Sequence, residues 1–405
     1  MIPTTLQSKA IDLTVQKYKN GDKKIVIAGP AGTGKTSTVK FIVEALLNLD
    51  RDKKVSKEDI IFCSYTGKAT LVLRQKGNEN AITLHKLLYD SIPREDGTFR
   101  RIPVSRIGYK IIIIDECSMV PKNMVDLLLS YPNIFCIFLG DNAQLPPVDK
   151  NADNHLLDNP DIYLNEILRQ AAESDIIQLS IAIREGKPIK PYKSKDVIVM
   201  TKKDFTTGVM TWGDQLLCAT NRTRTALNNQ FRRIQGRGTE PEDGDRLICL
   251  HNYDDRISMQ DNFPLVNGTT GTLHLPYKTF VRFSKYINPS IKNPQIDVLM
   301  GEFTMDGGNS FGRINIDYNE LMTGERCLDP RTIYMLSKQR RYGPRFIPCE
   351  FAFGYAITVW KAQGSEWGKV VILEEDFPRT REDHQRYLYT GVTRASDKVV
   401  LVLNE

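Results

Sequence analysis

Residues 24–36 read Lys-Ile-Val-Ile-Ala-Gly-Pro-Ala-Gly-Thr-Gly-Lys-Thr, an apolar run followed by a turn rich in glycine. The run predicts a buried strand over residues 24–28, and apolar residues at helical spacing predict a helix over residues 35–48. The turn fits the pattern G-x-x-x-x-G-K-[ST], in which backbone amides at a helix start close around phosphate oxygens. We expect Lys35 to reach the β- and γ-phosphates of a nucleotide and Thr36 to bind Mg²⁺. A glycine-rich structural turn is the alternative, and the flanking strand and helix argue against it.

Short β-branched runs recur along the first third of the chain, at residues 60–64, 110–115 and 134–140. They alternate with amphipathic stretches, which is typical of a parallel sheet with crossover helices. In each case polar, acidic or glycine residues follow the strand. Open α/β sheets bind their ligands at that edge, so we expect the functional side chains to gather there.

Two carboxylates, Asp115 and Glu116, directly follow four isoleucines at residues 111–114. Asp115 can join the Mg²⁺ shell, and Glu116 can orient and deprotonate an attacking water, which indicates hydrolysis of the nucleotide. Acidic residues often simply cap strands, but here the phosphate-binding turn lies upstream. Gln144 follows the next strand and can sense the γ-phosphate or the water. A polar turn stiffened by Pro146 and Pro147 is the alternative for that segment.

The rest of the chain shows two interruptions of the α/β pattern. Residues 89–109 carry a turn at Asp96-Gly97 and predict an inserted β-hairpin. A second α/β run has predicted strands at residues 197–200, 216–219 and 369–373. The interval 271–349 is rich in Gly, Pro, Asn and alternating apolar positions, which predicts a small all-β insertion.

Composition excludes several classes of protein. The 405 residues suggest two to four domains, and 41% apolar residues are ordinary for a globular protein. The chain has 55 Lys and Arg against 49 Asp and Glu, and this excess of +6 permits a polyanionic partner without requiring one. There is no apolar run long enough for a membrane span, no visible secretory signal and no CxxC pair among the seven cysteines. We therefore expect a cytoplasmic, multi-domain protein without a disulfide framework.

The motifs together carry a resemblance to a known family. GPAGTGKT (29–36), IIIIDECSM (111–119) and GDNAQLPPV (140–148) resemble motifs I, II and III of superfamily 1 helicases. Further matches are residues 63–70 to motif Ia, 83–85 to the element after it, 164–170 to a motif with an arginine finger, 355–366 to motif V and 387–395 to motif VI. Among the branches, the chain resembles the RecD/Dda group, which includes compact phage helicases that move 5′→3′ on single-stranded DNA.

This resemblance implies roles for individual residues. It implies catalytic roles for Lys35, Glu116, Gln144, Arg169 and Arg394, the two arginines acting as fingers on the γ-phosphate. ATP would be held by Gln7, Gly29, Gly32, Gly34, Lys35, Thr36 and Ser37, and Mg²⁺ by Thr36 and Asp115. Gln7 fits the glutamine that reads adenine. The DNA strand would lie along Thr66, Lys68, His85, Phe99, Thr358, Lys361 and Ser365.

Some of these roles have structural alternatives. A surface salt bridge is the commonest fate of an arginine. His85 and Thr358 can be satisfied structural residues. Phe99, near the tip of the hairpin, can be a wedge that splits base pairs or can dock on a neighbouring domain. Trp360 replaces the usual His of motif V, and it can stack on a base or lie buried between sheet and helix. The basic and aromatic residues 338–346 can contact nucleic acid or form a solvated turn.

The resemblance also implies an architecture and an activity. The fold would be α/β, with two RecA-like P-loop domains, a β-hairpin inserted in the first and an SH3-like insertion in the second. The expected bounds are 1–171 for the first domain, 172–270 with 350–405 for the second, and 271–349 for the insertion. The implied function is an ATP-dependent DNA helicase that acts as a monomer on single-stranded and forked DNA, with single-strand-binding or replication proteins as partners. A translocase that displaces proteins without unwinding, a non-catalytic binding module and an RNA substrate are the alternatives.

Overall fold

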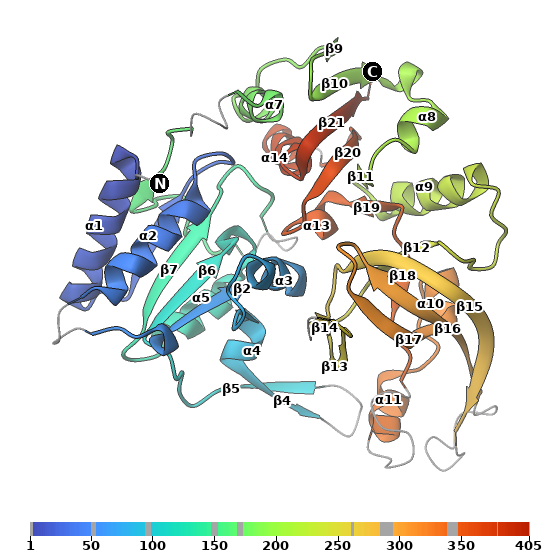
Figure 1. The fold of residues 1–405 in the computed structure, drawn as a ribbon, viewed down its shortest axis with the longest axis horizontal. Coiled ribbons are helices and arrows are strands. Elements are labelled where there is room, and N and C mark those ends of the chain that lie inside the picture. The colour runs from blue at the N-terminus through green and yellow to red at the C-terminus, as the bar shows by residue number, and fades with distance from the viewer. Residues whose placement is uncertain are drawn as a thin grey trace. The chain divides into compact units, whose positions relative to one another are not determined.

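The structure is a computed structural model (Figure 1). It describes residues 3–49, 54–93, 99–146, 153–167, 173–260, 263–283, 295–337, 347–378 and 380–404. The chain divides into two compact units. Unit 1 comprises residues 1–88, 104–221 and 358–405, and unit 2 comprises residues 89–103 and 222–357. Unit 1 contains two separate sheets, the first parallel and the second parallel except for its edge strand, and we call each sheet with its helices a lobe.

The first lobe is a six-stranded parallel sheet in the order β3-β2-β6-β7-β1-β8. The strands are β1 (Lys24–Ala28), β2 (Ile60–Ser64), β3 (Ile82–Thr83), β6 (Ile111–Asp115), β7 (Phe135–Gly140) and β8 (Ile162–Tyr163). The helices are α1 (Thr5–Asn20), α2 (Lys35–Leu47), α3 (Gly67–Gln75), α4 (Leu84–Leu88) and α5 (Lys122–Ser130), with 3₁₀ turns at Lys57–Asp59 and Cys117–Met119. The predicted α/β class and the strands of this region are confirmed.

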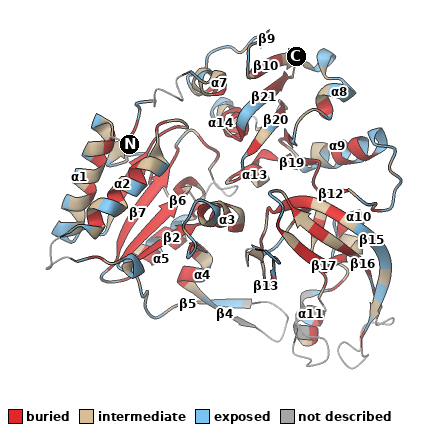
Figure 2. Ribbon diagram, viewed as in Figure 1, coloured by how far each residue is buried: buried red, intermediate tan, exposed pale blue. Residues whose placement is uncertain are grey.

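Burial explains why these strands read as continuous apolar runs. Ile25 and Ile27 of β1, Ile111 and Ile113 of β6 and Ile137 of β7 pack with residues of α1 and α2 in one core and are fully buried. Most residues of β1, β2, β6 and β7 are therefore buried and appear red in Figure 2. A parallel sheet is covered on both faces, so alternation of polar and apolar residues is absent.

The second lobe is a six-stranded sheet in the order β19-β11-β20-β21-β10-β9. Its strands are β9 (Tyr192–Lys193), β10 (Val197–Thr201), β11 (Gln215–Cys218), β19 (Ala356–Thr358), β20 (Trp367–Leu373) and β21 (Ala395–Leu403). Its helices are α7 (Asp175–Arg184), α8 (Thr207–Met210), α13 (Val359–Ala362) and α14 (Arg381–Val392), with a 3₁₀ turn at Lys202–Asp204. Strand β21 was not anticipated, yet it pairs in parallel with both β10 and β20.

Unit 2 contains a five-stranded antiparallel sheet in the order β17-β16-β15-β12-β18. Its elements are β12 (Arg246–Cys249), β15 (Thr270–Arg282), β16 (Gln295–Met305), β17 (Ser310–Asp317) and β18 (Phe351–Phe353), with β13 (Tyr253–Ile257), β14 (Pro264–Leu265), α9 (Asn221–Ile234), α10 (Tyr318–Thr323) and α11 (Pro330–Ser337). The hairpin strands β4 (Tyr89–Pro93) and β5 (Phe99–Pro103) pair in antiparallel register, as the sequence predicts.

The insertion differs from the sequence expectation in two respects. Strands β12 and β18 belong to the same sheet as β15–β17 and lie outside the expected interval 271–349. The interval also contains helices α10 and α11, so it is not all-β. Helix α10 begins at an Asp317 cap, whose carboxylate accepts the Glu320 amide at 3.0 Å, and it packs on β16, β17 and β18. The domain boundaries given above stay a prediction.

Candidate active site

The turn between β1 and α2 is a phosphate-binding loop in its backbone conformation. Gly32 and Gly34 have φ values of 83° and 75°, in the left-handed region that favours glycine. Gly34 is the N-cap of α2, so the free amides of the first helical turn face the loop. Lys35 Nζ donates to the carbonyl oxygens of Gly29 (2.6 Å) and Pro30 (3.1 Å). Its ammonium group therefore lies inside the loop, where phosphate oxygens are able to replace these carbonyls.

Asp115 and Glu116 lie at the carboxyl end of β6. The Asp115 carboxylate accepts the Glu116 amide at 2.9 Å. Glu116 has a φ of 53°, an uncommon conformation for a residue with a side chain, and it opens the 3₁₀ turn Cys117–Met119. Burial raises the pKa of Glu116, and the nearby guanidinium of Arg394 opposes this rise. The surroundings of Glu116 thus make its carboxylate a stronger base, which suits a general base.

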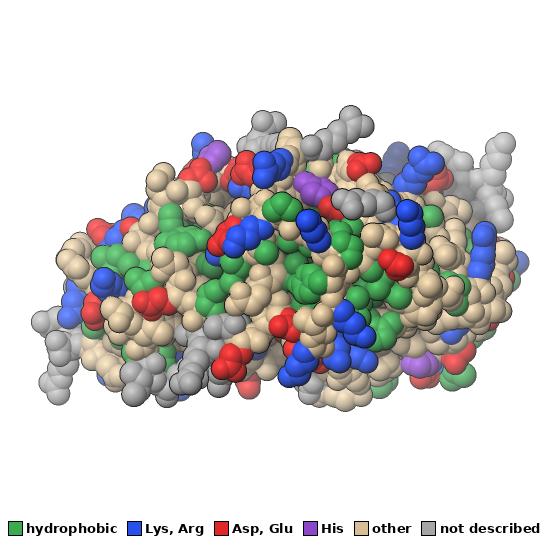
Figure 3. Space-filling view, turned by 90° about the horizontal axis from the view of Figure 1, so that it is seen from above, with side chains coloured by type: hydrophobic (Ala, Val, Ile, Leu, Met, Phe, Trp, Pro, Cys, Tyr) green, Lys and Arg blue, Asp and Glu red, His purple; other side chains and the backbone are tan. Residues whose placement is uncertain are grey.

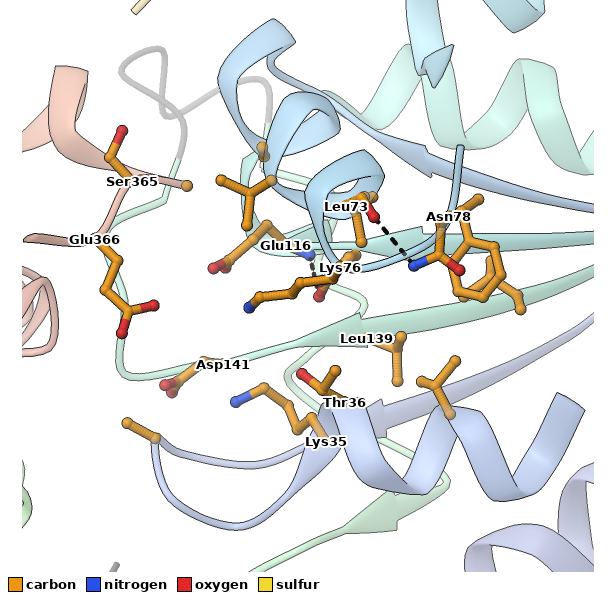
Figure 4. Close-up of a pocket in the computed structure, with 18 of the residues that line it drawn as sticks. Lys35, Thr36, Leu73, Lys76, Asn78, Glu116, Leu139, Asp141, Ser365 and Glu366 are labelled. Carbon is orange, nitrogen blue, oxygen red and sulfur yellow. Dashed lines mark hydrogen bonds between the residues drawn. The ribbon is translucent and has the colours of Figure 1, made fainter. Parts of the chain in front are cut away.

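A single cavity of about 530 Å³ joins residues of both lobes. The first lobe contributes the phosphate-binding loop and the carboxylates, and the second contributes the segment before β20 and the end of motif VI. The lining includes Lys35, Thr36, Asp115, Glu116, Asp141, Gln144, Gly364, Ser365, Glu366, Thr393 and Arg394. In Figure 4, Lys35, Glu116 and Asp141 lie on one side of the cavity and Ser365 and Glu366 on the other.

Arg394 is held at the wall of this cavity by groups of its own lobe. Its Nε donates to the Thr390 carbonyl (3.1 Å), its Nη1 to the Ser365 carbonyl (3.3 Å) and its Nη2 to the Thr393 hydroxyl (3.2 Å). The residue is only 7% exposed. The guanidinium is therefore fixed in direction, which suits a group that stabilises charge across a cleft.

The cavity fits a nucleotide with Mg²⁺. Thr36 and Asp115 offer the hydroxyl and carboxylate oxygens that Mg²⁺ prefers. The side-chain oxygens of Gln144 and Ser365 are buried and have no hydrogen-bond partner within the described parts of the chain. Buried polar atoms without a partner are costly, so both oxygens are available to a polar ligand. Among the described residues no cluster of three or more His, Cys, Asp or Glu forms another metal site.

Hydrogen bonds join the two lobes beside the cavity. The Leu145 amide donates to the Thr390 hydroxyl at 3.0 Å, and Gln363 Nε2 donates to the Leu145 carbonyl at 2.9 Å. The Tyr389 hydroxyl donates to Asp141 Oδ2 at 2.6 Å and accepts the Ala31 amide at 2.9 Å. Sequence reasoning gave none of these side chains a role, although Asp141, Gln363, Tyr389 and Thr390 all lie within the motifs that it matched.

Comparison with known proteins places the chain in a family. A family model described as an AAA domain matches residues 5–203, and one described as a UvrD-like helicase C-terminal domain matches residues 353–402. The ATP-dependent RecD2 DNA helicase of Deinococcus radiodurans is 27% identical over 93% of this chain and 46% of the relative. The ATP-dependent DNA helicase dda of Enterobacteria phage T4 is 28% identical over 45% of this chain and 42% of the relative. The chain belongs to the superfamily 1 helicases of the RecD and Dda type.

Solved structures of helicases share the fold. The Pif1 helicase from Bacteroides in complex with ADP-AlF3 and ssDNA has a TM-score of 0.55 at 17% identity, covering 99% of this chain and 92% of that one. The Pif1 helicase from Candida albicans has a TM-score of 0.52 at 18% identity, covering 99% and 95%. The chain spans less than half the length of the two curated relatives named above.

Within this superfamily 1 chain, Gln7 occupies a structural position beside the phosphate-binding loop. Its side-chain oxygen accepts the Thr4 amide at 3.0 Å and its Nε2 donates to the Gly34 carbonyl at 3.4 Å. It is 3% exposed, and it ties the start of α1 to the start of α2. Ser37 lies half-buried in α2. The adenine contact assigned to Gln7 stays a prediction.

The residues assigned to DNA contacts fall into different environments in this superfamily 1 fold. Thr66 caps α3 by accepting the Ala69 amide at 3.2 Å, and Thr358 caps α13 by accepting the Lys361 amide at 3.4 Å. In each cap the hydroxyl oxygen accepts one hydrogen bond through a lone pair. The O–H hydrogen is a separate donor, which could bind a phosphate. The His85 ring lies 5.4 Å from the Tyr65 ring. Lys68 lies in the first turn of α3.

Other assigned residues are placed differently or lie outside the description. Ser365 lines the nucleotide cavity, so its assignment to the strand groove is a prediction that no contact supports. The Trp360 ring lies 6.2 Å from Tyr387 and 6.0 Å from Phe377, in an aromatic cluster between α13 and α14. Arg169 and residues 338–346 lie outside the described residues, and for Phe99 only the backbone, in β5, is described.

Proposed function

We propose that the protein is an ATP-dependent DNA helicase that translocates 5′→3′ on single-stranded DNA and unwinds duplex DNA. The observation that carries this proposal is the cavity in which Lys35, Thr36, Asp115 and Glu116 of one lobe face Arg394 of the other. Such a site needs both lobes to complete it, so nucleotide occupancy is able to change their separation. The names of the relatives, which are ATP-dependent DNA helicases, support the substrate.

The chain's own residues divide the work of hydrolysis. Lys35 exchanges the carbonyls of Gly29 and Pro30 for phosphate oxygens, while Thr36 and Asp115 hold Mg²⁺. Mg²⁺ held by these two residues would supply positive charge that offsets the charge of the phosphates. Glu116 accepts a proton from the attacking water, and the fixed guanidinium of Arg394 stabilises charge that develops on the γ-phosphate.

The DNA strand would be held by groups that do not read bases. Thr66 and Thr358 stand at the N-termini of α3 and α13, where a free hydroxyl hydrogen and helix amides favour phosphate. On the face drawn in Figure 3, basic and acidic side chains are interspersed, so the net charge of +6 does not by itself mark a DNA surface there. On this face, strand contact would depend on individually placed donors rather than on a broad basic patch.

We further propose that the active form is a monomer bound to single-stranded or forked DNA, with single-strand-binding or replication proteins as partners. One chain contributes both walls of the cavity, so a second copy is not required to complete it. Within the described residues, no helix has the length and apolar character needed to cross a membrane.

Strand displacement on two tailed duplexes tests the function. The substrates differ only in a 5′ or a 3′ single-stranded tail, ATP hydrolysis is recorded in the same samples, and Lys35→Ala is the blank. We expect displacement from the 5′ tail alone. Displacement from the 3′ tail alone refutes the direction, and absence of ATP hydrolysis refutes the enzyme.

A substitution in the hairpin distinguishes duplex unwinding from translocation without unwinding. We expect Phe99→Ala, at the start of β5, to impair displacement of the duplex while single-strand-stimulated ATP hydrolysis is retained. Equal loss of both activities would assign the hairpin a structural role. ATP hydrolysis stimulated by the tail, without displacement in the unsubstituted protein, would identify a translocase.

A further inference from the structure

Tyr389 makes a buried bridge between the two lobes. Its hydroxyl accepts a hydrogen bond from the Ala31 amide (2.9 Å) and donates one to Asp141 Oδ2 (2.6 Å). Tyr389 is 1% exposed and Asp141 is fully buried. Burial and the Asp141 carboxylate raise the pKa of Tyr389, so the hydroxyl keeps its proton and remains a donor.

The three groups that meet at this hydroxyl come from functionally distinct segments. Ala31 is the third residue of the phosphate-binding loop, and Asp141 follows β7 at the carboxyl edge of the sheet. Tyr389 lies in the last turn of α14, five residues before Arg394. The Thr390 carbonyl, next along this helix, accepts the Arg394 Nε. Hydrogen bonds thus connect Ala31 of the loop, through Tyr389 and Thr390 of α14, to the Arg394 guanidinium.

We propose that Tyr389 is a positioning residue for the ATPase reaction. Its two hydrogen bonds hold the phosphate-binding loop and Asp141 in a fixed position relative to α14, the helix whose carbonyl binds Arg394. The inference rests on the proposed function. Tyr389 contacts protein groups and is not assigned a contact with substrate. Its contribution is therefore to the arrangement of Arg394 against the phosphates, a step that follows nucleotide binding.

This role predicts a split between binding and turnover. Lys35 and the amides of α2 bind the phosphates without help from Tyr389. Loss of the hydroxyl leaves Ala31 N–H and Asp141 Oδ2 without this partner and allows α14 to shift, because two of the bonds that join the lobes are gone. We expect Tyr389→Phe to lower kcat for ATP by about tenfold or more, and to change the Kd for ADP by less than about threefold.

Tyr387 provides a matched control on the same helix. Its hydroxyl is also buried and donates to the Leu373 carbonyl, within the second lobe. Tyr387→Phe therefore removes a buried tyrosine hydroxyl without touching the phosphate-binding loop. Both variants should lose stability, but only Tyr389→Phe should lose turnover.

A second variant tests the same bond from the other side. Asp141→Asn keeps an oxygen for the Ala143 amide, which Asp141 Oδ1 accepts at 3.0 Å, but removes the negative charge that accepts the hydrogen bond from the Tyr389 hydroxyl. If the two residues act through one bond, the double variant should lose little more than the more damaging single variant.

The experiment measures kcat and KM for ATP on the full chain, with and without single-stranded oligo(dT), and the Kd for fluorescent ADP. The folded fraction of each variant is matched by thermal melting. A tenfold lower kcat with near-normal ADP binding, found for Tyr389→Phe and not for Tyr387→Phe, supports the proposal. Normal kcat in Tyr389→Phe, or equal losses in the two variants, overturns it while leaving the proposed function standing. Absence of turnover in the unsubstituted protein refutes the proposed function and this inference together.

Discussion

Gly364, in the segment that resembles motif V, lies close to the first lobe of unit 1. It has a φ of 75°, and a Cβ built on it would lie 2.7 Å from Ala69 Cβ, 3.2 Å from Ala69 Cα and 3.3 Å from Ala69 N. Ala69 lies in the first turns of α3, so its backbone is fixed by the helix. The substitution Gly364→Ala therefore combines an unfavourable backbone conformation with a contact that cannot relax easily.

The magnitude follows from these two effects. A non-glycine residue in the left-handed region costs about 1–2 kcal/mol, and an extra methyl in a packed site costs about 1–3 kcal/mol. We expect Gly364→Ala to lower the free energy of unfolding by about 2–5 kcal/mol. Gln363 and Ser365, on either side, bind the Leu145 carbonyl and Arg394, so ATP turnover should fall as well.

Denaturant titration with a matched glycine separates the two effects. Gly21, at the C-cap of α1 in the same unit, has a φ of 81° and no atom within 4 Å of a built Cβ. Gly21→Ala thus carries the backbone cost alone, about 1–2 kcal/mol. Adding Ala69→Gly to Gly364→Ala removes the nearest contact atom and should recover part of the loss.

The reasoning is refuted if Gly364→Ala and Gly21→Ala are equally destabilised and ATP turnover is unchanged in both. That result would mean that the lobes are not in contact at Ala69 in solution. Failure of Ala69→Gly to recover stability, with Gly364→Ala strongly destabilised, would assign the whole cost to the backbone.

Three further substitutions have defined outcomes. Glu116→Gln should retain ATP binding while the hydrolysis rate falls by about 10²–10⁴-fold, because the general base is lost; undiminished hydrolysis would exclude that role. His384 Nε2 donates to Glu374 Oε1 at 2.8 Å, and this contact raises the pKa of His384 above 6.5. Its stabilisation is complete below that value and is lost as pH rises through the higher folded pKa, so His384→Gln should lower Tm more at pH 6 than at pH 9; a loss independent of pH would contradict this. In unit 2, Arg232→Ala should cost about 1.5–3 kcal/mol in a denaturant titration because it removes the 3.1 Å partner of the fully buried Asp245 carboxylate and leaves Arg237 at 3.6 Å; a loss below about 1 kcal/mol would contradict that pairing.

Local patterns determined the elements that carry the chemistry. Strand β1, the glycine turn and helix α2 were all predicted from residues 24–48, because strand, turn and helix each follow from neighbours along the chain. The hairpin β4–β5 and the strands β2, β6 and β7 were accessible for the same reason. Strand β21 was missed because three residues of its first half, Ser-Asp-Lys at 396–398, are polar and exposed, and only its pairing with β20 and β10 makes it a strand.

The sequence by itself determined which residues are equipped to bind and hydrolyse a nucleotide, since Lys35, Thr36, Asp115 and Glu116 lie in short motifs whose geometry is local. Only the tertiary structure decided how the second lobe completes the site. The bridge from Tyr389 to Ala31 spans 358 positions of the chain, and the bond from Gln363 to Leu145 spans 218. Such contacts depend on how two sheets pack against each other, which the spacing of residues along the chain does not specify.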